Sequence, residues 1–185
     1  MTTPTDWLAL TQEEAIEPDL PIIDPHHHFW DRPNNRYVLD DLAADVAAHH
    51  VQQTVFIECT SMYRADGPEE FRVVGETEFV QGLAAVSASG RHGDLRAAAG
   101  IVGSADLRLG DRVAPVLEAQ IAAAPQRFRG IRHRAAWAEP GVLPNQPASV
   151  QPHVLVDPDF RRGFAALRTY GSCSKPGSTT PSCRS

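Results

Sequence analysis

The sequence of 185 residues predicts an α/β fold built on a parallel sheet. Short apolar runs alternate about four times with longer segments whose apolar residues recur at helical spacing, which is typical of parallel strands joined by right-handed crossovers. Polar or titratable residues also stand at the C-terminal ends of the candidate strands, where parallel barrels place their chemistry. These two observations are independent of each other.

Four short segments are predicted to be strands because they are apolar and rich in aliphatic, β-branched or aromatic residues. In chain order they are residues 21–24, 53–58, 97–102 and 128–133. The second of them, Gln-Thr-Val-Phe-Ile-Glu, has the composition of a strand, and the third, Ala-Ala-Ala-Gly-Ile-Val, suits a buried one.

Four longer segments are predicted to be helices from the spacing of their apolar residues. In chain order they are residues 39–50, 76–89, 112–124 and 159–170. The third is the clearest, because Val113, Val116, Leu117 and Ile121 form one amphipathic stripe. A proline-rich loop over residues 140–158 precedes the last helix.

Composition is that of an ordinary globular protein, with 42% hydrophobic and 22% charged residues. The net charge of −6 and the lack of a basic stripe argue against nucleic acid and anionic membranes as partners. The N-terminus has no basic-then-apolar signal pattern, and no apolar stretch is long enough to span a bilayer, so we expect a cytoplasmic protein. Three cysteines, Cys59, Cys173 and Cys183, lack the paired spacing of a disulfide framework or a structural zinc site.

The segment Asp-Pro-His-His-His-Phe-Trp-Asp at 24–31 carries the clearest chemical signal. His26 and His28 are two positions apart, and on an extended strand such residues project from the same face, while His27 points away. Both imidazoles can therefore reach one divalent metal ion, which would polarise a carbonyl or activate water. Asp24 has two interpretations: it orients an imidazole, or it simply ends the strand before Pro25.

Two other strand ends supply candidate substrate contacts, each with a structural alternative. Glu58 is a candidate substrate contact or metal-side carboxylate, and equally a partner in a salt bridge. Arg132 offers a planar fork suited to a carboxylate, or else forms a structural ion pair. His133 follows Arg132 at the same strand end.

The His-x-His element followed by Phe-Trp-Asp, the strand ending at Glu58 and the later segment Phe-Arg-Gly-Ile-Arg-His at 128–133 together resemble the amidohydrolase-related TIM-barrel hydrolases. The nearest branch is the one with sugar-acid and pyrone lactonases. The resemblance covers residues 20–170, about four βα units, and implies the N-terminal half of a (β/α)8 barrel. A full barrel takes roughly 250 residues, so the barrel here is incomplete.

The resemblance also implies a function, metal-dependent hydrolysis of a cyclic ester (lactone) or amide. His26 and His28 would be the metal ligands, for Zn or Mn, and Arg132, His133 and Glu58 would lie near a small anionic lactone. Later-strand ligands and a general base are missing, so metal binding would be weak or absent and the chain an inactive or impaired fragment. The alternatives are a decarboxylase of the same superfamily and a non-enzymatic truncated fragment.

Three regions are expected: an N-terminal extension over 1–19, the partial barrel over 20–170, and an aberrant tail over 171–185. The tail is rich in Gly, Ser, Thr and Pro, has no helical or strand period, and is expected to be disordered. In a shifted reading frame it can encode a segment that looks like the family's fifth strand, so we expect a frameshift near residue 170. An open half barrel would leave strand edges and apolar surface free for self-association.

Overall fold

A computed structural model of the chain describes residues 10, 13–139, 141–142 and 150–170. The tail over 171–185 lies outside the described residues, as do most of the proposed extension over 1–19 before residue 13 and part of the loop over 140–158.

A four-stranded parallel sheet forms the centre of the described structure, which confirms the predicted α/β class. Its strands are β1 (Ile22–His27), β4 (Val51–Ile57), β5 (Arg96–Gly103) and β6 (Phe128–Ile131), in the order β1-β4-β5-β6. Each pair is parallel, with Phe56 opposite Ile101 and Ile101 opposite Phe128. All four C-terminal strand ends therefore meet at one edge of the sheet.

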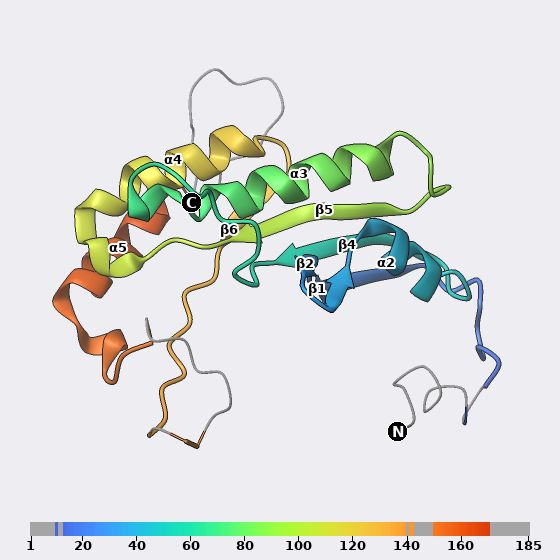
Figure 1. Cartoon of the computed structure of the whole chain (residues 1–185), viewed down its shortest axis with the longest axis horizontal. Helices are drawn as coiled ribbons and strands as arrows, with labels where there is room; N and C mark the ends of the chain where they lie inside the picture. The colour runs from blue at the N-terminus through green and yellow to red at the C-terminus, as the bar shows by residue number, and fades with distance from the viewer. Residues whose placement is uncertain (1–9, 11–12, 140, 143–149, 171–185) are drawn as a thin grey trace.

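Helices α3 (Val74–Ala88) and α4 (Ala114–Ala123) lie on one side of this sheet (Figure 1). Helix α5 (Pro158–Tyr170) packs beyond the sheet, where the Tyr170 hydroxyl donates to Glu118 Oε1 over 2.9 Å. Helix α2 (Leu39–Asp45) is shorter than the predicted helix over 39–50. After Asp45 the chain forms tight turns instead of an α-helix, because the N–H groups of Ala47 and His49 donate to carbonyls three residues back. Strand β4 follows directly on these turns.

Several short elements were not predicted from the sequence. Strands β2 (Trp30–Arg32) and β3 (Asn35–Tyr37) form an antiparallel hairpin directly after the histidine motif. Its tight turn includes Asn34, which adopts the left-handed conformation with φ 61° that asparagine tolerates well. The part of the chain that the structure describes also contains the 3₁₀ helices η1 (Glu69–Phe71), η2 (Leu107–Val113) and η3 (Val154–Val156).

Two apolar clusters hold these elements together. The first lies between the sheet and α3, with Phe29, Phe56, Val80 and Ile101 fully buried. The second joins η2 and α4 to α5 through Leu107, Val116, Leu117 and Phe160. Each such side chain contributes about 1.5–3 kcal/mol when it leaves water. The second cluster fixes the segments that follow β5 and β6, and these segments carry the candidate site.

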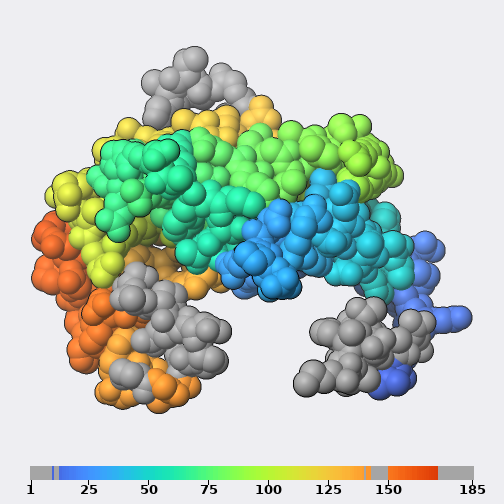
Figure 2. Space-filling model, viewed as in Figure 1, coloured from blue at the N-terminus to red at the C-terminus, as the bar shows by residue number. Residues whose placement is uncertain are grey.

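Figure 2 shows α5 (orange to red) at one end of the molecule and the first described residues (blue) at the other. Strands β1 and β6 each have one neighbouring strand within the described part of the chain. None of the described helices is long and apolar enough to cross a membrane.

Candidate functional site

The end of β1 places the three histidines as the strand alternation predicted. The rings of His26 and His28 lie edge to face, with their centroids 5.0 Å apart. The ring of His27 is buried on the other side, where Nε2 lies 2.7 Å from Thr54 Oγ1. Burial lowers the pKa of His27 to about 4, so this ring is neutral at physiological pH. His27 is thus a core residue, and His26 and His28 form a separate pair.

His28 has a defined tautomer. Its Nδ1 lies 2.7 Å from the carbonyl oxygen of Ile57, at the end of β4. A carbonyl only accepts, so Nδ1 carries the hydrogen and Nε2 keeps its lone pair. Partial burial also lowers the pKa of His28, which favours the neutral ring. A neutral imidazole held through Nδ1–H by a carbonyl is the arrangement seen in metal-ligating histidines.

Asp24 acts on the backbone next to this pair. Its Oδ1 accepts the main-chain N–H of His26 over 2.9 Å. The pairing register between β1 and β4 is irregular between Asp24 and His27, the stretch that contains this hydrogen bond. Asp24 therefore fixes the chain that carries the His26 ring, while no bond from Asp24 to an imidazole is formed.

His26 and His28 bring two imidazole rings together, with their centroids 5.0 Å apart. Across the residues that the structure describes, no cluster of three or more His, Cys, Asp or Glu side chains is suitably placed to hold a metal. Two ligands bind far more weakly than the three or four of a complete site.

Glu58 and Arg132 form an ion pair between a buried carboxylate and a guanidinium that is about one-third exposed, the structural alternative of the sequence prediction. The Glu58 side chain is only 3% exposed, and its Oε1 accepts from Arg132 Nε over 2.7 Å. Arg134 Nε donates to the same oxygen over 3.1 Å. A second nitrogen of Arg132 donates to the Glu58 carbonyl. One carboxylate thus holds two guanidinium groups at the C-terminal edge of the sheet.

A cavity of about 210 Å³ opens beside this ion pair. Its walls come from the segments after three adjacent strands and include Glu58, Tyr63, Asp106, Arg132, His133 and Arg134. All three predicted substrate-contact residues therefore line one pocket, at the end of the sheet where parallel α/β proteins bind ligands. The metal-ligand candidates His26 and His28 stand outside this lining, next to it through the bond from His28 to Ile57.

The charges of the pocket favour an anion. Three guanidinium groups line it, those of Arg108, Arg132 and Arg134, against two carboxylates, Glu58 and Asp106. Arg108 pairs with Asp106 over 2.7 Å, and Glu58 forms ion pairs with both Arg132 and Arg134. One positive charge therefore remains in excess, on groups that are about one-third exposed and able to contact a ligand.

His133 is anchored at the wall of the pocket. The N–H of Leu107 donates to its Nδ1 over 3.3 Å, and its ring meets the Phe160 ring edge to face at 5.1 Å. Its side chain is 12% exposed. His133 thus joins the ends of β5 and β6 to α5.

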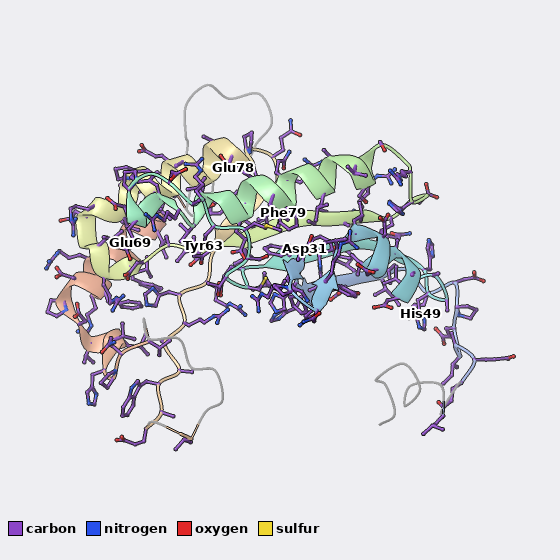
Figure 3. The ribbon with its side chains drawn as sticks, in the orientation of Figure 1. Asp31, His49, Tyr63, Glu69, Glu78 and Phe79 are labelled. Atoms are coloured by element: carbon purple, nitrogen blue, oxygen red, sulfur yellow. The ribbon has the colours of Figure 1, made fainter. Side chains whose placement is uncertain are left out.

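Sequence reasoning missed Arg134, Tyr63 and Asp106. Arg134 stands two residues after Arg132, and in an extended segment this spacing returns a side chain to the same face, a signal that was available. Tyr63 lies beside the start of α3 (Figure 3). Burial raises the pKa of its hydroxyl to about 12. Figure 3 shows His49 at the opposite end of the sheet from Tyr63.

Comparison with known proteins gives little further information. No family model matches the chain, and no solved structure matches it. The chain is similar to an uncharacterized protein of Sinorhizobium fredii (strain NBRC 101917 / NGR234), y4mH, with 29% identity over 175 residues. The match covers 83% of this chain and 52% of that protein. The chain therefore spans about half the length of the curated relative that it matches.

Proposed function

We propose that this chain carries part of the active site of a metal-dependent hydrolase that opens a cyclic ester or amide bearing an anionic group, with a lactone favoured. The observation that carries the proposal is the shared edge of the sheet. There a histidine pair with one defined tautomer stands next to a pocket lined by three arginines. Metal ligands beside an anion pocket are the parts that such a hydrolysis requires.

Each residue has a role in this proposal. His26 and His28 hold a divalent ion, Zn or Mn, which when bound supplies Lewis-acid polarisation of a carbonyl or a more acidic water. Arg132 and Arg134 orient the anionic group of the substrate, and Glu58 fixes both guanidinium groups before substrate arrives. His133 completes the wall of the pocket.

The same proposal places the chain as the N-terminal half of a (β/α)8 barrel. Four parallel strands with helices on one side support it, as does a relative about twice as long. The described edges of β1 and β6 would then face the rest of a barrel, supplied by further chain or by a second copy. Size-exclusion chromatography distinguishes a monomer from an associated form, and a monodisperse, cooperatively melting monomer would contradict self-association.

An assay of ring opening tests the function. The chain, and a version restored to the shifted frame after residue 170, are supplied with Zn²⁺ or Mn²⁺ and offered matched lactones with and without a carboxylate. We expect the restored version to hydrolyse the anionic lactone only, with this activity lost in His28→Ala and reduced in Arg134→Gln, whereas the exposed control Glu78→Gln keeps full activity. Release of carbon dioxide from enol or aromatic acids without lactone hydrolysis would favour the decarboxylase instead. No turnover by either form would overturn the proposal.

A further inference from the structure

Glu76 is a fully buried acid for which the proposed chemistry has no use. It lies in the first turn of α3 with no exposed surface. Its Oε1 accepts two main-chain hydrogen bonds, from the N–H of Cys59 over 2.9 Å and from the N–H of Ser61 over 2.8 Å. Both donors belong to residues 59–62, the segment that follows β4 and Glu58, which we name the β4 turn.

The β4 turn adopts a conformation that its own residues disfavour. Thr60 has φ 64° and Met62 has φ 53°, and neither is a glycine. A β-branched threonine in the left-handed region is a clear outlier, and such residues persist where the surrounding structure holds them. Cys59 and Ser61 are buried, so water cannot satisfy their N–H groups in place of Glu76.

The start of α3 docks directly on the chain that leaves this turn. A Cβ added at Gly75 would stand 2.5 Å from the Met62 carbonyl oxygen and 2.7 Å from the Arg64 nitrogen. The N–H of Arg64 also donates to the Arg72 carbonyl over 2.9 Å. Helix and turn are therefore in backbone contact, and Glu76 reaches the turn from a fixed base.

The β4 turn in turn places part of the pocket wall. Glu58 immediately precedes it, Thr60 belongs to it and Tyr63 follows it, and all three line the pocket. We propose that Glu76 is a positioning residue, whose single oxygen Oε1 holds the β4 turn so that Glu58 presents Arg132 and Arg134 to an anion. This inference rests on the proposed function only in taking the pocket as the anion site.

The second carboxylate oxygen of Glu76, Oε2, takes no part in holding the β4 turn. Oε2 is buried and has no hydrogen-bond partner among the described residues. The anchoring therefore needs one acceptor oxygen at the end of a side chain of this length. A glutamine supplies that oxygen, whereas an aspartate is one methylene shorter and an alanine has no acceptor.

The test compares Glu76→Gln, Glu76→Asp and Glu76→Ala with Glu78→Gln, an exposed acid on the same helix. All are made in the full chain with Cys173→Ser and Cys183→Ser, so that Cys59 is the single thiol. One readout is the rate at which a maleimide labels Cys59 under native conditions, divided by the thiolate fraction of each variant because burial and the neighbouring Glu76 carboxylate both raise the pKa of this thiol. The corrected rate reports opening of the β4 turn. The other is calorimetric affinity for malonate, a dicarboxylate probe of the pocket.

We expect Glu76→Ala and Glu76→Asp to label at least tenfold faster and to bind malonate at least tenfold more weakly. Glu76→Gln and Glu78→Gln should stay within threefold of the parent in both readouts. A folded Asp or Ala variant with parental labelling and affinity would overturn the inference, and so would a Gln variant that behaves like Ala. If the parent binds no malonate, the anion pocket of the proposed function fails, while the labelling rates still decide whether Glu76 holds the turn.

Discussion

Arg132 Nε lies 2.7 Å from Glu58 Oε1, although the two residues are 74 positions apart in the chain. Their meeting requires β4 and β6 to end at the same edge of the sheet, with β5 between them. Arg134 shares the same oxygen, so one buried carboxylate organises two cations. The relationship links the fold to the pocket, because the residues that stabilise this edge are also those that would meet an anionic ligand.

Glu58→Gln should destabilise the fold by about 2–3 kcal/mol, because it leaves two guanidinium groups without their buried carboxylate. Glu78→Gln is the matched control, since the Glu78–Arg64 pair is exposed and should contribute less than about 1 kcal/mol. Urea unfolding of the two variants measures the difference. Equal losses would show that the ion pairs of the buried Glu58 carboxylate stabilise the fold no more than an exposed pair does.

Two glycines of α3 should respond oppositely to alanine. Gly75→Ala should cost about 2 kcal/mol or more, because the new methyl group meets backbone atoms of Met62 and Arg64 that cannot move aside cheaply. Gly82→Ala should gain about 0.5–1 kcal/mol, since nothing lies within 4 Å of the added carbon and alanine favours the helix. Thermal melts of both variants check this, and a stabilised Gly75→Ala protein would contradict the close docking.

The pH dependence of stability should differ between the parent and Glu76→Gln. Burial raises the pKa of Glu76 in the folded state, and the hydrogen bonds from Ser61 and Cys59 only partly oppose this shift. A folded-state pKa above the unfolded one gives stability that is complete below the unfolded value of 4.5 and is lost as pH rises through the folded value. The parent should therefore lose stability relative to Glu76→Gln from about pH 4.5 upward. Denaturant unfolding at several pH values measures the gap, and a constant gap would refute the shift.

Much of the fold could be predicted because its signals are local. The aromatic and β-branched run before Glu58 and the apolar stripe from Val113 to Ile121 indicate strand and helix without knowledge of their partners. The helix predicted over 39–50 is longer than the observed α2, because the apolar spacing continues to Val46. After Asp45 the backbone hydrogen bonds span three residues instead of the four of an α-helix. The hairpin of β2 and β3 was missed, because three-residue strands are too short to show a period.

The site was predictable only as far as strand ends mark it. His26, His28, Glu58, Arg132 and His133 could be named as candidates because each stands at or next to the end of a strand. Glu76 was not, because a glutamate inside an amphipathic helix has the same sequence appearance whether it faces solvent or a buried turn. Its role depends on the left-handed conformation of Thr60 and Met62, which no local pattern in the sequence predicts.

Metal titration measures whether His26 and His28 hold a metal ion. The metal-free chain is titrated with Zn²⁺ against a chromophoric chelator, beside His26→Ala, His28→Ala and the exposed control His49→Ala, which lies at the far end of the sheet. We expect about one weakly bound equivalent of Zn²⁺ in the parent and in His49→Ala, with affinity at least tenfold lower in each of the other two variants. Equal affinity in all four proteins, or no binding by the parent, would contradict a metal held by His26 and His28.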